Sequence, residues 1–284
     1  MTVPVPVAAG RARLAQVPAG LHRFGGESSC TAVIAFISDI HANLPALEAV
    51  FADIDSLGSV DGVYCLGDVV GYGPQPVECL EMVASRCKVI LMGNHEHAVI
   101  FGAYGFHAPA KRAVDWTREI LDSVEPLPRR KVLRQLIEGL PERHEMGDLL
   151  LVHGSPRDPV MEYVLESDLW EGSDPEKMDQ IFNGFQRICL IGHTHRPGVF
   201  TTDRCFLASS EIGEGFDVSD GKYLVNVGSV GQPRDRDTRA CYTLYTGDAV
   251  YFRRVAYDIA ETVRRFKTVP QLEARFAERL TRGE

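Results

Sequence analysis

Short apolar runs that end in polar loops recur along the first part of the chain. The first three runs cover residues 32–37, 63–66 and 89–92, and each is followed by a loop that carries a carboxylate or amide side chain. Continuous apolar runs of this length are typical of strands buried on both faces. They alternate with predicted helices over 44–57 and 75–85. The pattern therefore indicates an α/β fold built from βαβ units.

The remainder of the chain predicts a second sheet and further helices. Residues 98–145 are predicted to be mainly helical. Later apolar runs have the shorter spacing that we expect of a more antiparallel second sheet, and they cover 149–152, 188–191, 223–227, 241–245 and 250–255. The expected organisation is a flexible extension over 1–30, one domain over 31–257 with helical or cap segments at about 98–145 and 156–187, and a charged helical tail over 258–284.

Composition narrows the class of protein. The net charge of −9 argues against a broad electrostatic grip on long DNA or RNA, although a bound metal ion still allows an anionic substrate. The cysteine count of seven is odd and contains no CxxC pair, which disfavours a disulfide framework and a thiolate zinc site. There is neither a bilayer-length apolar stretch nor a secretory signal. We therefore expect a cytoplasmic protein without membrane association.

Five motifs follow apolar runs and bring together residues that bind metals. They are Asp39-Ile40-His41, Gly67-Asp68, Gly93-Asn94-His95-Glu96, His153-Gly154 and Gly192-His193-Thr194-His195. Any one of them has a plainer reading as a turn or a helix cap. Together they supply oxygen and imidazole donors without thiolate, which suits Mn, Fe, Co, Ni or Zn. Open α/β sheets place their sites just past the strand ends, so the five motifs predict one metal site.

The order DxH, GD, GNHE, HG, GHTH resembles the signature of the calcineurin-like metallophosphoesterases. The resemblance implies a four-layer αββα sandwich of two mixed sheets flanked by helices, with a dinuclear metal site at the strand ends. One metal would be held by Asp39, His41 and His195, and the other by Asn94, His153 and His193, with Asp68 bridging both. His95 would stay free of metal as the catalytic residue beside the scissile phosphate.

The chemistry implied by this resemblance is hydrolysis of a phosphate ester by in-line attack of a metal-bridging hydroxide. His95 would donate a proton to the leaving oxygen or stabilise charge there. We expect two ions, Mn in the first place, with Fe, Zn, Ni or Co as alternatives. Many members of the family have Asp where this chain has Glu96, so the carboxylate that orients His95 is left open.

Longer segments resemble a bacterial branch of phosphodiesterases and relatives of diadenosine tetraphosphatase. These segments are SDIHAN, GDVVGYGPQP, HGSP and NVGSVGQPRD. Candidate substrate contacts are Asn94, Tyr72, Arg234 and Arg236, although alternating charges over 234–237 fit a solvated loop nearly as well. Aromatic and Met side chains form either a cap over the cleft or core, namely Phe101, Tyr104, Phe106, Met161, Tyr163 and Trp170.

The favoured function is a phosphodiesterase acting on a small, nucleotide-like phosphodiester. A dinucleoside polyphosphate hydrolase is the next alternative, followed by a phosphomonoester or protein phosphatase. Protein serine/threonine phosphatases carry a GDxVDRG motif whose second aspartate and arginine are missing here, which disfavours that activity. A non-catalytic scaffold with the same fold is the remotest alternative. The natural substrate, the metals bound in the cell and the oligomeric state are left open by the sequence.

Overall fold

The computed structural model describes residues 32–284, so the predicted extension over 1–30 lies outside the described part of the chain. Two six-stranded sheets form its centre. The first sheet has, in spatial order, β3 (Val89–Ile90), β2 (Gly62–Cys65), β1 (Ile34–Ile37), β11 (Ala240–Tyr245), β12 (Ala249–Val255) and β9 (Phe216–Asp217). The second has β4 (Arg143–Met146), β5 (Leu149–Val152), β6 (Ile188–Ile191), β10 (Tyr223–Asn226), β7 (Gly198–Thr201) and β8 (Phe206–Ala208).

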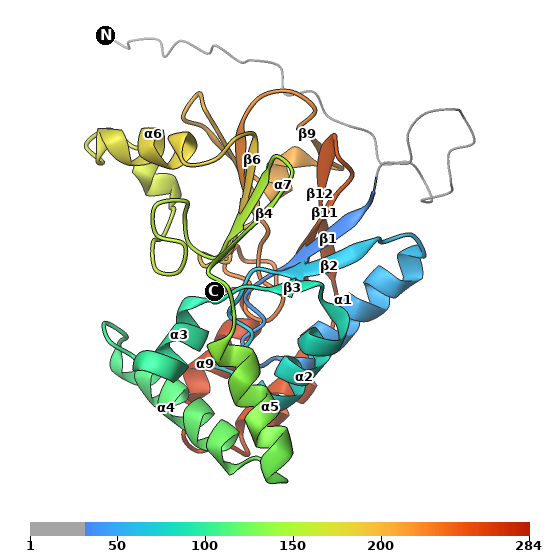
Figure 1. The fold of residues 1–284 in the computed structure, drawn as a ribbon, viewed down its shortest axis with the longest axis vertical. Coiled ribbons are helices and arrows are strands. Elements are labelled where there is room, and N and C mark those ends of the chain that lie inside the picture. The colour runs from blue at the N-terminus through green and yellow to red at the C-terminus, as the bar shows by residue number, and fades with distance from the viewer. Residues whose placement is uncertain (1–31) are drawn as a thin grey trace.

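Helices cover the outer sides of the two sheets. Figure 1 shows most of them gathered at one end of the molecule, with α6 (Pro175–Asn183) at the other. The large group comprises α1 (Leu44–Leu57), α2 (Pro76–Arg86), α3 (Asn94–Phe101), α4 (Ala108–Ser123), α5 (Leu127–Glu138), α8 (Ile259–Phe266) and α9 (Ala274–Leu280). Short helical turns lie at Glu166–Leu169 and at α7 (Ser209–Ile212). No helix within residues 32–284 is both long and apolar enough to cross a membrane.

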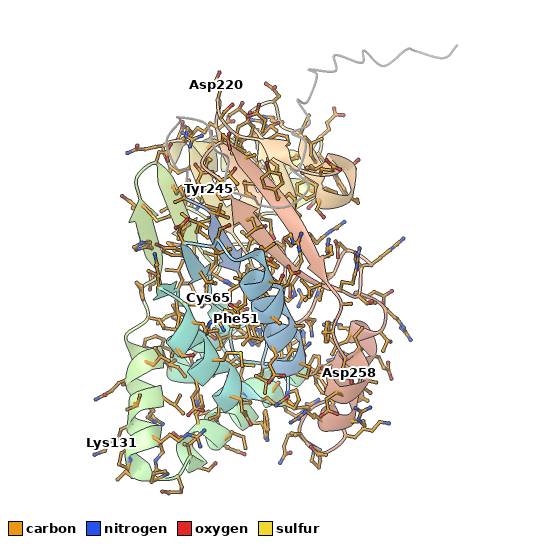
Figure 2. All side chains as sticks on the ribbon, turned by 90° about the vertical axis from the view of Figure 1, so that its right-hand side faces the viewer. Phe51, Cys65, Lys131, Asp220, Tyr245 and Asp258 are labelled. Atoms are coloured by element: carbon orange, nitrogen blue, oxygen red, sulfur yellow. The ribbon has the colours of Figure 1, made fainter. Side chains whose placement is uncertain are left out.

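Three apolar layers explain why the strand sequences are continuously apolar. In β1, Ala35 and Ile37 pack toward the helices while Phe36 packs between the two sheets. In β6, Leu190 packs between the sheets and Ile191 packs toward α6. Successive side chains of a strand point to opposite faces, so a strand covered on both faces is apolar at every position. The four-layer αββα sandwich is thereby confirmed, and Figure 2 labels Phe51 and Cys65 in the first layer and Tyr245 in the second.

Two expectations about the strands were wrong. The runs over 241–245 and 250–255 were expected in the second sheet, but they form β11 and β12 of the first, where β11 pairs antiparallel with β1. Spacing along the chain does not determine which sheet a strand joins, because backbone pairing does. The third run is also shorter than expected: the strand β3 ends at Ile90, and the N–H group of Met92 no longer bonds to β2 but donates to the carbonyl of Pro141 at 2.8 Å.

Helical segments mostly agree with the sequence pattern. α1 has the predicted bounds, and its N-cap Asn43 accepts a hydrogen bond from the Ala46 N–H at 3.4 Å. The Asn43 amide also donates to the Gly231 carbonyl at 2.8 Å, and its oxygen accepts from Thr262 on α8 at 2.9 Å. One side chain thus joins the loop after β1 to two later segments. Residues 98–145 are helical as predicted, except that β4 begins at Arg143.

Candidate active site

The five motifs follow strands of both sheets, four of them in loops and the third along the chain at the start of α3, and those strands end at one place. The first sheet supplies the loops after β1, β2 and β3, and the second supplies those after β5 and β6. All seven predicted metal ligands are buried there: Asp39, His41, Asp68, Asn94, His153, His193 and His195. Their His and Asp members form groups whose possible ligand atoms lie within 4.8 Å of one another. The structure thus joins residues that lie up to 156 positions apart in the sequence.

Left-handed backbone conformations point these side chains inward. Positive φ angles occur at five of the seven, namely Asp39, His41, Asp68, His193 and His195, with values from 49° to 66°. Each such non-glycine conformation costs about 1–3 kcal/mol and is typically found at functional sites. Hydrogen bonds offset the strain. The N–H of His41 donates to the Asp68 carbonyl at 2.9 Å, and the N–H of His193 donates to Oδ2 of Asp39 at 3.0 Å.

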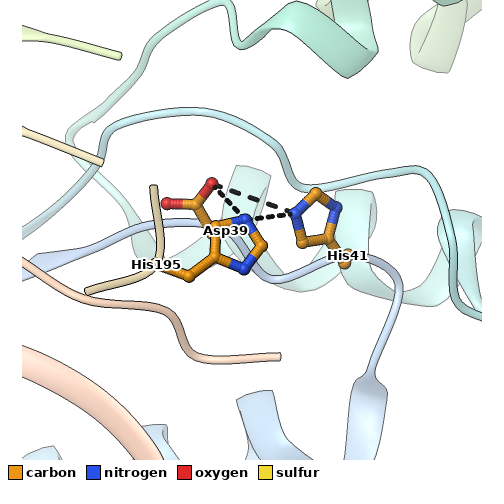
Figure 3. Close-up of side chains that lie close together, drawn as sticks. All are labelled: Asp39, His41 and His195. Carbon is orange, nitrogen blue, oxygen red and sulfur yellow. Dashed lines mark hydrogen bonds and ion pairs between the residues drawn. The ribbon is translucent and has the colours of Figure 1, made fainter. Parts of the chain in front are cut away.

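The first group consists of Asp39, His41 and His195 (Figure 3). The Nε2 atoms of His41 and His195 are 3.0 Å apart, and Oδ1 of Asp39 lies 3.2 Å from His195 Nε2. This Oδ1 atom is buried and has no hydrogen-bond partner within residues 32–284. A buried carboxylate oxygen without a partner is unfavourable unless a cation binds it. The donor set therefore fits a metal ion.

Hydrogen bonds from the far side of these two rings fix where their protons lie. Nδ1 of His41 is 3.2 Å from the Val70 carbonyl, and Nδ1 of His195 is 2.5 Å from the Gln232 carbonyl. A carbonyl only accepts, so Nδ1 carries the proton and Nε2 of the neutral ring presents a lone pair. Two lone pairs facing each other at 3.0 Å repel unless a cation lies between them. Metal-ligating histidines are held by backbone acceptors in this way.

The second group repeats the arrangement on the other side of Asp68. His153 Nδ1 is 3.0 Å from the Leu66 carbonyl, and His193 Nε2 is 3.2 Å from the Met161 carbonyl. When both rings are neutral, as metal binding requires, the remaining ring nitrogens present lone pairs to each other at 3.0 Å. Oδ1 of Asn94, also an acceptor, lies 3.1 Å from His153 Nε2. Again only acceptor atoms converge on one point.

Asp68 lies between the two groups. Its Oδ2 is 3.4 Å from Nε2 of His153 and 3.7 Å from Nε2 of His41, so one carboxylate faces both sets. Burial lowers the pKa of His193 to about 3, and that of His41 falls well below its ordinary value for the same reason. Burial also opposes charge on His153, but the Asp68 carboxylate raises its pKa to about 9. Metal binding at His153 therefore displaces a proton.

His95 lies beside both groups and is placed by packing. Its ring centroid is 4.8 Å from that of His41, 4.5 Å from Tyr72 and 5.1 Å from Phe106. Burial lowers its pKa to about 4. Nδ1 of His95 is buried without a hydrogen-bond partner in the described chain, and it faces Gly71, where an added Cβ would lie 1.9 Å away. Glycine is thus the one residue type at position 71 that admits this ring position.

The carboxylate of Glu96 has a different task from orienting His95. It accepts hydrogen bonds from the backbone N–H groups of Asp68 at 2.8 Å, Val70 at 2.9 Å and Gly93 at 3.0 Å. Glu96 therefore ties the start of α3 to the loop after β2. No carboxylate within the described residues bonds to the Nδ1 atom of His95, so no acidic partner orients the ring through that nitrogen.

A cleft of about 380 Å³ opens over the second group. Of the predicted substrate contacts, Tyr72, Asn94 and Arg234 line it. Arg236 does not: it is exposed, and its N–H donates to the Gly283 carbonyl at 2.8 Å, so the last residues of the chain pack beside it. The structure thus gives no support to a substrate role for Arg236.

Other cleft residues were left open or missed by sequence reasoning. Tyr104, Phe106, Met161 and Tyr163, for which cap and core were both considered, line the cleft. Arg279 on α9 lines it as well, although the sequence predicted only a helical tail there. No local motif marks Arg279. The sequence does contain one relevant pattern: Phe276 and Leu280 give this charged helix an apolar face, which predicts that the helix packs onto the domain.

Comparison with known proteins agrees with the site. The family model described as calcineurin-like phosphoesterase matches residues 32–197. An uncharacterised protein of Methanocaldococcus jannaschii is 34% identical over 238 residues, which cover 80% of this chain and 88% of that protein. The crystal structure of a metallophosphoesterase from Sphaerobacter thermophilus has a TM-score of 0.72 at 37% identity, covering 89% of this chain and 100% of that one.

A more partial similarity concerns a named enzyme. The symmetrical bis(5'-nucleosyl)-tetraphosphatase of Paracidovorax citrulli is 32% identical over 141 residues, which cover 46% of this chain and 48% of that enzyme. The match thus spans about half of either protein. Together with the family match over residues 32–197 and the clustered His and Asp side chains, these similarities show that the chain belongs to the calcineurin-like phosphoesterases, a family of dinuclear-metal phosphoester hydrolases.

Proposed function

We propose that this chain is a phosphodiesterase that hydrolyses a small, nucleotide-like phosphodiester. One observation carries the proposal: four imidazoles have one nitrogen facing a backbone carbonyl and the other facing a second acceptor atom at about 3 Å. In the proposed centre, Asp39, His41 and His195 hold one metal ion and Asn94, His153 and His193 hold the other, with Asp68 shared. Mn is the first choice of metal, with Fe, Zn, Ni or Co as alternatives.

The protein's residues have separate roles in this proposal. When bound, the two metals supply a nucleophile from water near neutral pH and neutralise phosphoryl charge. Asp68 sets the spacing of the two groups from its central position. His95 acts as a catalytic residue without binding metal: it stabilises the charge that develops on the leaving oxygen or donates a proton to it, and its pKa of about 4 favours the first role. Since Nδ1 of His95 faces Gly71, Nε2 is the nitrogen that serves the substrate.

The walls of the cleft favour a nucleotide-like substrate. Tyr72, Phe106 and Tyr163 line it, and aromatic rings stack on bases with little dependence on their sequence. Its volume of about 380 Å³ is in the range of small-molecule sites. The acidic net charge of −9 disfavours long nucleic acid. Free thiols at Cys65, Cys79 and Cys189 support a reducing, cytoplasmic setting.

A dinucleoside polyphosphate hydrolase is the second candidate. The similarity to enzymes named symmetrical bis(5'-nucleosyl)-tetraphosphatase favours it, although that similarity spans only 46% of this chain. Both candidates use the same centre and differ in the bond attacked, an ester in one case and an anhydride in the other. The choice between them is a question of substrate, to be answered by kinetics.

The test is a parallel assay of protein stripped of metal and reloaded with Mn. Bis(p-nitrophenyl) phosphate, p-nitrophenyl phosphate and diadenosine tetraphosphate are supplied separately, with the Asp68→Asn protein as the blank. We expect Mn-dependent cleavage that is fastest for the diester. Preference for diadenosine tetraphosphate would transfer the proposal to the second candidate. Preference for the monoester, or no cleavage with two metals bound, would overturn both.

A further inference from the structure

Two arginines face the cleft without an acidic partner. Arg234 and Arg279 both line it, and neither forms an ion pair with a carboxylate within residues 32–284. By contrast, Arg275, one turn before Arg279 on α9, pairs with Glu273 at 2.7 Å. Glu284 also lines the cleft, but its ion pair is with Arg282 at 3.9 Å. Two guanidinium groups without a direct ion pair therefore face the cleft, and the Glu284 carboxylate acts on Arg279 only through its charge.

Packing fixes the position of Arg279 relative to the active site. Phe276 on α9 is fully buried, and its ring centroid is 4.9 Å from that of Tyr72. The Tyr72 ring packs in turn against His95 at 4.5 Å. Arg279 is three positions after Phe276, so both lie on the same face of the helix. Arg279 thus lines the cleft on the side where Tyr72 packs against His95.

Arg234 lines the same cleft from the segment between β10 and β11. The backbone N–H of Arg234 donates to the carbonyl of His195 at 3.3 Å, which ties this segment to the candidate metal centre. The side-chain Nη2 of Arg234 donates to Oε1 of Gln232 at 2.9 Å, while its Nε is buried and has no hydrogen-bond partner in the described chain. Burial and the nearby Arg234 charge lower the pKa of Arg279, which is consistent with two guanidinium groups facing one space.

Two unpaired guanidinium groups beside each other repel, and a bound anion removes that repulsion. Phosphoryl oxygens match the forked donors of arginine better than any other common group. We propose that Arg234 and Arg279 bind a second phosphoryl group of the substrate, next to the one that is hydrolysed. The substrate class is then a nucleotide ester or anhydride with at least two linked phosphoryl groups. This inference rests on the proposed function for the position of the scissile group.

The experiment compares anions that have one or several phosphoryl groups. Isothermal titration calorimetry on the full, Mn-loaded chain measures binding of tripolyphosphate and of orthophosphate. Three variants are used: Arg279→Ala, Arg279→Lys, which keeps charge and stem but loses the fork, and Arg275→Ala as the matched control on the same helix. We expect Arg279→Ala to weaken tripolyphosphate binding about tenfold or more and orthophosphate binding less than about twofold. Arg275→Ala should change neither.

Unchanged tripolyphosphate binding in Arg279→Ala, or equal weakening for both anions, would overturn the inference. If the alanine variant has a lowered Tm, the lysine variant decides by the same criterion. A kinetic arm separates this result from the proposed function: Arg279→Ala should raise KM for diadenosine tetraphosphate about tenfold, whereas the control Arg275→Ala should leave KM and turnover within about twofold. Absence of any turnover would overturn the proposed function alone, since the calorimetric comparison does not depend on it.

Discussion

At the scale of single residues, His95 is positioned by rings and by the absence of a side chain at Gly71. Its ring packs against His41, Tyr72 and Phe106, and its backbone N–H donates to Oδ1 of Asp68 at 2.8 Å. These contacts hold the ring beside the candidate metal ligands His41 and Asp68, with which it also forms a group that could hold a metal ion. The sequence predicted the residue through its motif, but the reason for its orientation depends on Gly71, which is 24 positions earlier.

Replacement of His95 by Ala should remove catalysis and leave the metal centre in place. General acid catalysis contributes about 10²–10⁴-fold, so kcat should fall by that factor. Metal content, measured by inductively coupled plasma mass spectrometry, should remain that of the wild type. His97→Ala is the control and should keep full activity, because the His97 ring lies on the same helix and packs at a tilt against Phe101, with ring centroids 4.6 Å apart. Loss of a metal in His95→Ala would mean that His95 is itself a ligand.

Gly71→Ala should reproduce the loss of activity expected for His95→Ala while residue 95 remains histidine. The new Cβ would lie 1.9 Å from Nδ1, and the backbone there has φ +83°, so the ring must move. We expect kcat to fall about 10²-fold or more with both metals retained. Gly58→Ala is the matched control: φ is +69° and no atom lies within 4 Å of the added Cβ, so only about 1 kcal/mol of stability is lost. Wild-type kcat in Gly71→Ala would contradict the assigned ring position.

At the scale of elements, the sequence predicted strands and helices well because each run carries its own burial pattern. The bounds of α1 agree with the prediction, the strands β1, β5 and β6 lie within the predicted runs, and β2 begins one residue before its predicted run. Sheet membership was less accessible, since β11 joins β1 through pairing partners about 200 residues apart. The docking of α9 onto Tyr72 was missed for the same reason: a helix pattern reveals an apolar face without naming what that face covers.

Glu96 connects elements, and its removal should loosen the loop that holds Asp68. Its carboxylate accepts three backbone N–H groups, and a Gln side chain has only one acceptor oxygen. We expect Glu96→Gln to lower the free energy of unfolding of the metal-free protein by about 2–4 kcal/mol, measured in urea, and to weaken Mn binding. Glu48→Gln, an exposed position on α1, should change stability by less than about 0.5 kcal/mol. Equal stability of Glu96→Gln and wild type would refute this role.

At the scale of the whole molecule, the proposed metal centre joins the two sheets. Asp39, His41, Asp68 and Asn94 follow strands of the first sheet, and His153, His193 and His195 follow strands of the second. Elsewhere the sheets are joined by apolar packing and by a few hydrogen bonds, such as that from Arg187 to the Tyr245 hydroxyl at 2.8 Å. Without cations, the convergent acceptor atoms repel, and the left-handed ligand residues keep their strain. The fold and the centre are therefore expected to stabilise each other.

Metal removal should consequently lower the melting temperature of the full chain. Ions that bind only the folded state at 100 times their Kd add about 2.7 kcal/mol, which corresponds to about 5–10 °C for a chain of this size. Differential scanning calorimetry of chelated and Mn-loaded protein measures the shift, and metal analysis should find two ions per chain.

Asp68→Asn, which alters the shared carboxylate, should bind fewer ions, lose most of the shift and lose turnover. Asp220→Asn, at an exposed position, should behave as wild type. Two retained ions in Asp68→Asn, or one melting temperature for chelated and loaded wild type, would exclude a centre that bridges the sheets through Asp68.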